Sequence, residues 1–165
     1  MFENPEFSGE FEHTLDEKGR IIIPSNLRKP LGEKFYLSPS LISKCIWALP
    51  AATWQYIGNS FLAQINPLDK VGQKFVTKFS SYSFPAEMDK QGRIIVPQKL
   101  REYAEIEENR ILLLGITGSP SRIEIWSHDK YKKIEKEDNI IELAEVMFRD
   151  RKLTFNPQAF SNPAQ

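Results

Sequence analysis

The sequence is poor in the residues that build disulfides, metal clusters and histidine-dependent active sites. Its 165 residues include one cysteine, Cys45, and two histidines, His13 and His128. A single cysteine cannot form an internal disulfide, and with two scattered histidines it gives no metal cluster. No nucleophile–base pair, paired-carboxylate motif or phosphate-binding glycine loop accompanies them. We therefore interpret both histidines as surface or core residues and expect neither an enzyme nor a bound cofactor or metal.

Long hydrophobic runs and an excess of charge are also missing. No apolar stretch approaches the ~18 residues of a membrane helix, and the opening residues, MFENPE, are acidic, which disfavours a signal peptide. The 22 basic residues balance 22 acidic ones, so any nucleic-acid contact must be local. With 41% hydrophobic residues, the composition predicts a globular protein, and the single cysteine favours the cytoplasm. We expect no membrane partner and no small-molecule substrate.

An internal repeat organises the chain. Residues 16–28 (DEKGRIIIPSNLR) and 89–101 (DKQGRIIVPQKLR) align without gaps at an offset of 73. In each copy Asp-x-x-Gly is typical of a turn, because the aspartate can accept backbone bonds and glycine tolerates positive φ. A short β-branched strand follows, and a proline ends it. With the alternating segment before each turn, the pattern predicts two β-hairpins with Asp-x-x-Gly-Arg at their tips.

Other periodicities place strands and helices around the two copies. Further strands are expected at residues 35–37, 46–49, 111–114 and 123–126. Helix-spaced apolar residues predict one helix over 54–65, a second with Asn66 as its N-cap and Pro67 in its first turn, and a third after the second copy. Residues 98–104 can continue their motif as a helix, whereas Pro30 is expected to cut short the equivalent helix. One copy would bury little surface alone, so we expect the two to pair about a pseudo-twofold axis in a small barrel.

The basic residues are concentrated on the two motif copies. Residues 1–16 hold five acids and no lysine or arginine, residues 17–34 hold five bases against two acids, and residues 90–103 hold four against one. Such a patch suits a DNA phosphate backbone, and an arginine at a turn can reach a guanine edge. A merely solvated charged surface is the alternative. Arg28 and Arg101 are candidates for either role, and we favour a structural one in which they pair with Asp16 and Asp89.

The two ordered copies resemble the MraZ family of bacterial transcriptional regulators, which belongs with the AbrB/SpoVT-like swapped-hairpin proteins. In the first half the similarity lies in FSGE at residues 7–10 and in HTLD at 13–16 running into KGR at 18–20. In the second half it lies in MDKQGR at 88–93, LREYA at 100–104 and RIEIWS at 122–127. It extends from about residue 7 to residue 134, most of the chain.

The resemblance implies a β-rich α+β fold. Two fused AbrB-like swapped-hairpin halves would form a pseudo-twofold, double-split β-barrel with flanking helices. The first half would span residues 7–57, connecting helices 58–81, the second half 82–129, a C-terminal helix 130–155 and a flexible tail 156–165. Subunits would assemble into a ring-shaped, octamer-like homo-oligomer.

The resemblance also implies a DNA-binding regulator of the cytoplasm and nucleoid. Family members bind double-stranded DNA at short G-rich direct repeats in the promoter of their own division and cell-wall gene cluster, through the Asp-x-x-Gly-Arg hairpins. On this sequence the base contacts map to Arg20 and Arg93. The phosphate contacts map to Lys18, Lys90, Lys29 and Lys99, and the turn-shaping residues are Asp16, Gly19, Asp89 and Gly92.

An AbrB-like antitoxin, or another protein-binding module, is the alternative function. Such antitoxins usually carry one hairpin unit per chain, dimerise, and bind their toxin with a disordered tail. Here both units share one chain and the residues after 134 have a helical pattern, which disfavours an antitoxin. The polar, proline-containing residues 156–165 keep this alternative open.

Overall fold

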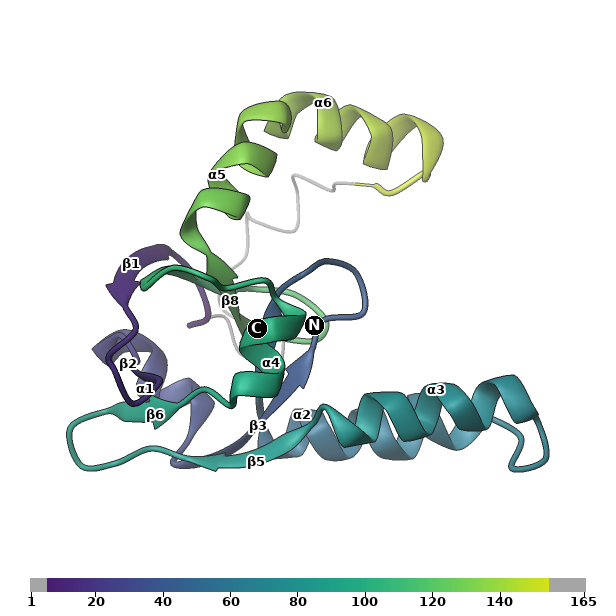
Figure 1. The fold of residues 1–165 in the computed structure, drawn as a ribbon. Coiled ribbons are helices and arrows are strands. Elements are labelled where there is room, and N and C mark those ends of the chain that lie inside the picture. Colours follow the sequence, from purple (N-terminus) through teal and green to yellow (C-terminus); the bar gives the residue numbers. More distant parts are fainter. Residues whose placement is uncertain (1–5, 155–165) are drawn as a thin grey trace, which may run out of the picture. The chain divides into compact units, whose positions relative to one another are not determined.

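The computed structural model describes residues 6–154, which fall into a larger unit ending at residue 131 and a C-terminal unit beginning at residue 132. The expected tail at residues 156–165 lies outside the described residues. All strands belong to the larger unit, and the fold is mixed α+β (Figure 1).

An antiparallel six-stranded sheet is the framework of the larger unit. Its order is β1 (Glu10–Thr14), β7 (Arg110–Ile116), β8 (Arg122–Ser127), β4 (Ile46–Pro50), β3 (Lys34–Pro39) and β5 (Phe84–Glu87). The strands expected from the sequence around residues 35–37, 46–49, 111–114 and 123–126 are thereby confirmed. The sheet begins at β1 and ends at β5, so these six strands do not close into a barrel.

The two repeat copies exchange their edge strands. Strand β1 precedes the first motif but pairs with β7, which follows the second, while β5 precedes the second motif but pairs with β3, which follows the first. In the middle of the sheet, β4 pairs with β8. Each half therefore completes its part of the sheet with a strand of the other, which explains why a single copy would be an incomplete unit.

The motif strands form a separate two-stranded ribbon. Strand β2 (Arg20–Ile22) pairs antiparallel with β6 (Arg93–Ile95), and Ile21 lies opposite Ile94. The predicted hairpins are therefore wrong in their strand pairing. The strands before the two turns, β1 and β5, pair within the large sheet, and the strands after the turns, β2 and β6, pair with each other. The exchange brings Ile21 and Ile94 together in the core, where each is 1% exposed.

A short helix follows each motif strand. These are α1 (Ser25–Leu31) and α4 (Gln98–Tyr103). Pro30 does not cut α1 short as expected but lies inside it. In the last turn a proline forfeits few helical hydrogen bonds, and Leu27 and Leu31 remain buried on one face of the helix. The helix ends at Gly32, whose φ of 84° is accessible to glycine.

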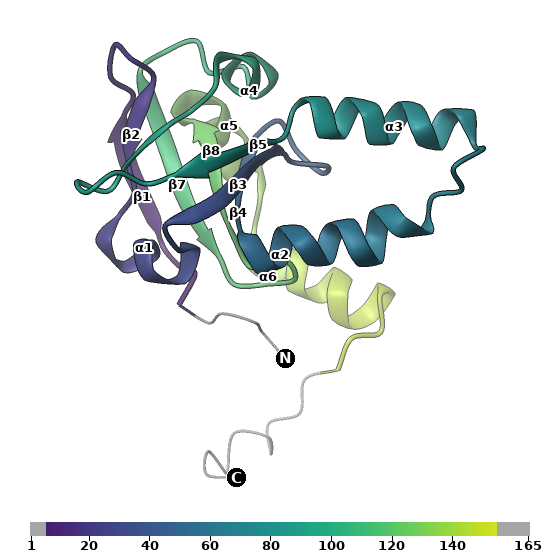
Figure 2. The same ribbon diagram turned by 90° about the horizontal axis from the view of Figure 1, so that it is seen from below.

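A helical arm connects the two halves and extends away from the sheet in both views (Figures 1 and 2). It comprises α2 (Ala51–Tyr56), a π-helical turn (Ile57–Phe61), a 3₁₀ turn (Leu62–Gln64) and α3 (Lys70–Ser81). The N-cap of α3 is Asp69, which accepts a bond from the Val71 N–H, and not Asn66 as predicted. Asn66 instead accepts a bond from the Leu68 N–H and shapes the loop before the helix.

The central strands are buried on both faces of the sheet. In β4, Ile46 and Ala48 belong to the core beneath the ribbon, whereas Trp47 and Leu49 belong to a second core against the arm. Stacked rings join β3 to the arm, with 4.8 Å between the Tyr36 and Trp54 centroids, and continue within the arm from Trp54 to Phe79. Burial on both faces explains the continuous apolar runs of these strands.

The C-terminal unit is helical. Helix α5 (His128–Glu137) runs into it from the larger unit and is followed by α6 (Ile140–Glu145) and a π-helical turn (Val146–Asp150). The segment expected as one helix is thus divided at Asn139, whose side chain caps α6 by accepting bonds from the Ile141 and Glu142 N–H groups.

The orientation of the ribbon predicts unequal losses of stability for substitutions at two adjacent isoleucines. Ile94 is buried and Ile95 is 63% exposed. We expect Ile94→Ala to lower the free energy of unfolding by about 2–5 kcal/mol, because it leaves a core cavity. Ile95→Ala should cost less than about 1 kcal/mol. Urea unfolding followed by circular dichroism measures both. Equal losses for the two variants would contradict this orientation of β6.

Candidate nucleic-acid interface

The first Asp-x-x-Gly-Arg turn is closed by its own aspartate. Asp16 Oδ1 accepts bonds from the backbone N–H groups of Lys18 and Arg20, both at 2.9 Å. Asp16 Oδ2 accepts a 2.7 Å bond from Arg20 Nε. Gly19 has a φ of 74°, a conformation that glycine adopts without strain. The carboxylate thus fixes the turn and the arginine side chain together.

The second turn repeats this geometry. Asp89 Oδ1 accepts 2.9 Å bonds from the Gln91 and Arg93 N–H groups, and Asp89 Oδ2 accepts a 2.7 Å bond from Arg93 Nε. Gly92 has a φ of 78°. Two segments separated by 73 residues therefore hold an arginine in the same way.

Each arginine is held by one edge and presents the other. The aspartate bonds occupy Nε, and within residues 6–154 neither Arg20 nor Arg93 has a hydrogen-bonding partner for its Nη nitrogens. The two side chains are 27% and 32% exposed. A guanidinium with ordered geometry and unused Nη donors is suited to bidentate recognition of a planar acceptor pair.

Both arginines lie on the same face of the β2–β6 ribbon. Arg20 is opposite Ile95 and Arg93 is opposite Ile22. Because opposed residues of an antiparallel pair share a face and alternate residues return to it, these four side chains form the outer face of the ribbon. Ile22 and Ile95 are 46% and 63% exposed. The period-two alternation of Arg-Ile-Ile predicts that Ile22 and Ile95 lie on the same face as the arginines, but the sequence analysis did not identify these two isoleucines as site residues.

The predicted phosphate-contacting lysines are placed in two different settings. Lys18 and Lys90 are exposed within the two turns, and Lys29 is exposed on α1. Lys99, on α4, donates a 3.0 Å bond to the Ser81 carbonyl and lies 4.4 Å from the centroid of the Tyr82 ring. The structure therefore groups Lys18 and Lys90 with the ribbon arginines and directs Lys99 toward the end of the arm.

Arg28 and Arg101 do not pair with the turn aspartates, which are taken by Arg20 and Arg93. Each guanidinium instead lies against the glycine of the other motif. A Cβ atom on Gly92 would overlap the guanidinium of Arg28, and one on Gly19 would lie 3.2 Å from Arg101 Nη2. The two motifs also exchange 2.8 Å backbone bonds, from the Ile23 N–H to the Gly92 carbonyl and from the Val96 N–H to the Gly19 carbonyl.

The two arginines differ in one respect. Arg28 Nε donates a 2.8 Å bond to the Ile23 carbonyl, whereas Arg101 Nε is buried without a hydrogen-bonding partner in the described part of the chain. An unsatisfied buried donor costs stability. The first motif therefore has the better-bonded helix arginine.

The cysteine is poorly placed for chemistry. Cys45 is buried, and burial raises the pKa of its thiol far above the ordinary value, which disfavours the nucleophilic thiolate. No set of three or more potential metal ligands is grouped among residues 6–154. In the same range, none of the helices has the length and apolar character needed to cross a membrane.

Comparison with known proteins identifies relatives over most of the chain. The sequence model of the family described as "MraZ protein, putative antitoxin-like" matches two segments, residues 7–70 and 83–151, one on each motif copy. A "Transcriptional regulator MraZ" from Acetivibrio thermocellus is 37% identical over 134 residues, covering 81% of this chain and 90% of the relative. A protein of the same name from Clostridium beijerinckii is 40% identical over 134 residues, with 81% and 89% covered.

The turn geometry predicts a stability contribution that depends on pH. The pKa of Asp16 and that of Asp89 lie below the ordinary value of 3.8, first because the Arg20 and Arg93 backbone N–H groups donate to the carboxylates. A lowered pKa in the folded state stabilises the protein at pH values above the unfolded pKa, and this contribution is lost as pH falls through the folded pKa. We expect Asp16→Asn/Asp89→Asn to lower the Tm at neutral pH.

The difference in Tm between this variant and the wild type should narrow as the pH falls below the ordinary aspartate value of 3.8. Thermal unfolding monitored by circular dichroism across this range measures the gap. Asp138→Asn, at an exposed position between α5 and α6, is the control and should leave the Tm unchanged throughout. A gap of the same size at every pH would show that the carboxylate charge is not what stabilises the turns.

Proposed function

The chain belongs to the MraZ family, and on this premise we propose that it is a transcriptional regulator that binds double-stranded DNA with the outer face of the β2–β6 ribbon. The observation that carries the proposal is the pair of arginines on that face, each held at Nε by its turn aspartate. The regulatory name of its relatives describes a non-enzymatic role.

The ribbon has a shape that DNA can accept. The major groove admits a two-stranded antiparallel ribbon, and arginine bound through two donors to guanine O6 and N7 is the commonest specific base contact. Arg20 and Arg93 are diagonal neighbours in the ribbon, a relation that sets two residues about 7–8 Å apart, with their Cβ atoms somewhat closer. That spacing is close to two base-pair steps of about 3.4 Å, so both can read one short G-rich element.

The aspartates prepare the arginines for this contact. A flexible arginine loses side-chain entropy when it orders on a base. Because Asp16 or Asp89 already holds Nε in the free protein, less side-chain entropy is lost on binding DNA. The ion pair also compensates the aspartate charge, which would otherwise be repelled by phosphate. Ile22 and Ile95, exposed between the arginines, can contact thymine methyl groups.

Phosphate contacts are proposed for Lys18 and Lys90 in the turns and for Lys29 on α1, all exposed. Lys99 would have to leave the Ser81 carbonyl to reach a phosphate. Gly19 and Gly92 give the turns their shape, and Arg28 and Arg101 support the opposite turn. In this scheme the base contacts provide sequence preference and the lysines provide affinity.

We expect Arg20→Ala/Arg93→Ala to abolish the preference for the operator. The probe is the promoter fragment upstream of the protein's own gene. We propose that this promoter, which would control a division and cell-wall operon, contains the operator. Each bidentate contact contributes about 1–3 kcal/mol of discrimination, so preference over a shuffled duplex should fall by about 5- to 150-fold per arginine. Fluorescence anisotropy at two salt concentrations measures it, with circular dichroism to verify the fold.

Two further variants separate base reading from charge. Lys18→Ala should weaken binding to both duplexes alike and flatten the salt slope by about one unit. Arg149→Ala removes an exposed arginine of the C-terminal unit and should change nothing. An undiminished operator preference in the double arginine variant would refute the base-reading role. Equal, weak binding of wild type to both duplexes would favour a protein-binding, antitoxin-like module.

We also propose that the exchanged edge strands belong to a pseudo-twofold, double-split barrel, and that subunits form a ring-shaped, octamer-like homo-oligomer in the cytoplasm and nucleoid. One ribbon contacts few base pairs and binds weakly. Several ribbons on direct repeats raise affinity through effective concentration.

Light scattering after size exclusion should therefore give a mass of several subunits. Affinity should rise steeply when the DNA carries two or more correctly spaced repeats in place of one. A dimeric mass, with affinity independent of repeat number, would contradict the ring. It would leave single-ribbon binding as the remaining mode.

A further inference from the structure

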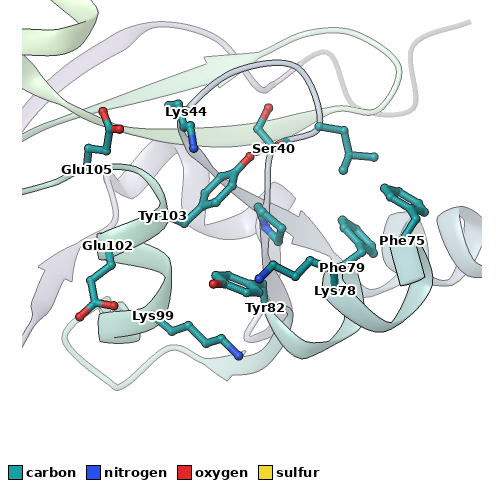
Figure 3. A pocket seen from close by; sticks show the side chains of 12 residues that line it. Ser40, Lys44, Phe75, Lys78, Phe79, Tyr82, Lys99, Glu102, Tyr103 and Glu105 are labelled. Atoms are coloured by element: carbon teal, nitrogen blue, oxygen red, sulfur yellow. Dashed lines mark hydrogen bonds between the residues drawn. The ribbon is translucent and has the colours of Figure 1, made fainter. Parts of the chain in front are cut away.

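A pocket of about 460 Å³ lies where the two halves meet the arm (Figure 3). Its walls come from three distant segments: the loop after β3 with Ser40 and Lys44, the C-terminal half of α3 with Phe75 to Tyr82, and α4 with Lys99 and Tyr103. All of them belong to the larger unit. The volume is within the range of pockets that take small organic ligands.

Three ammonium groups line this pocket. Lys44 Nζ lies 4.9 Å from the centroid of the Tyr103 ring, and Lys78 Nζ and Lys99 Nζ lie 4.9 and 4.4 Å from that of Tyr82 (Figure 3). Among the ion pairs of residues 6–154, none includes any of these lysines. Like charges gathered without carboxylate partners repel one another, and a bound anion would relieve that repulsion.

The two carboxylates of the pocket are already engaged. Glu105 pairs with Lys130, and Glu102 Oε1 accepts a 3.0 Å bond from Gln98 Nε2 on its own helix. In Figure 3 the Glu102 carboxylate points away from the Tyr82 ring and from the lysines beside it. A bond from a neutral amide leaves the Glu102 charge in place, so the lining keeps a positive balance of three exposed lysines against one uncompensated carboxylate.

Aromatic side chains form the rest of the lining. Phe75 and Phe79 stack with centroids 5.9 Å apart, and Tyr82 meets Tyr103 edge to face at 6.1 Å. The Tyr103 hydroxyl donates a 2.5 Å bond to the Ser40 carbonyl, which ties α4 to the loop after β3 and fixes the ring. Such surfaces favour a planar ring.

We propose that this pocket binds a small molecule in which a planar aromatic ring is joined to a phosphate chain, as in a nucleoside triphosphate. The lysines meet the phosphates as point charges, and the ring packs among the tyrosines and phenylalanines. An apolar ligand would leave the ammonium groups uncompensated, and inorganic phosphate would leave the aromatic wall unused. The pocket includes none of the four side chains of the ribbon's outer face.

Isothermal titration calorimetry of the full chain tests this site with ATP, GTP and UTP as probes. At least one nucleotide should bind with a Kd below about 1 mM. Adenosine, which lacks phosphates, and tripolyphosphate, which lacks a ring, should each bind more weakly than ATP. Lys44→Gln/Lys78→Gln should weaken nucleotide binding by about tenfold or more, because it removes two of three charge-assisted contacts.

Matched variants keep the test specific. Lys74→Gln removes an exposed lysine one turn before Lys78 and outside the pocket, and it should leave nucleotide binding unchanged. Tyr82→Leu should weaken ATP but not tripolyphosphate. Single Lys78→Gln, at an exposed position, serves if the double variant does not fold.

Three results would overturn the proposal. The first is no binding of any of the three nucleotides up to about 5 mM, a concentration above the expected Kd. The second is binding that is unaffected by the Lys44 and Lys78 substitutions. The third is equally tight binding of tripolyphosphate, which would show a general attraction of polyanions to exposed lysines.

Discussion

The pairing of β2 with β6 is the interaction on which the rest of this structure depends. Each strand has three residues, too few to persist alone, and each motif supplies what the other lacks. Ile21 and Ile94 fill the core side by side, and each turn glycine accepts a backbone bond from the opposite motif. The same pairing sets both turn arginines on one face. A single contact surface between the halves therefore creates the core and the candidate interface together.

The turn aspartates link folding to recognition in a local way. Asp16 and Asp89 close their turns through backbone bonds and hold the arginines through Nε. The rigidity of each turn and the order of its arginine thus have one source, and a change that loosens one loosens the other. The second motif is the less completely bonded copy, because Arg101 Nε has no partner in the described residues where Arg28 Nε has the Ile23 carbonyl.

Local patterns predicted local structure, and the exchange between the halves was beyond them. Turn residues and apolar alternation located the strands, and the aspartates occupy turns as their spacing indicates. A hairpin and a strand exchange have the same local signature, however, so the partner of β2 could not be read from the local pattern, and only the family resemblance implied swapped hairpins. Asn66 and Asp69 are both suitable N-cap residues, and the sequence alone does not show that α3 begins at Lys70, directly after Asp69. Pro30 is tolerated because burial of its neighbours outweighs one lost bond.

The lysine-lined pocket had no sequence signal, because its walls are brought together only by the exchange of the halves. Helix α4 joins it to the ribbon: Lys99 and Tyr103 face the pocket, Leu100 is buried in the core, and Arg101 lies against Gly19 of the first turn. A pocket ligand and DNA would therefore act on different sides of one six-residue helix. If both ligands shift that helix between the same two arrangements, each must change the affinity of the other by the same factor. A rigid α4 would leave the two sites independent, so the mobility of this helix determines whether they are coupled.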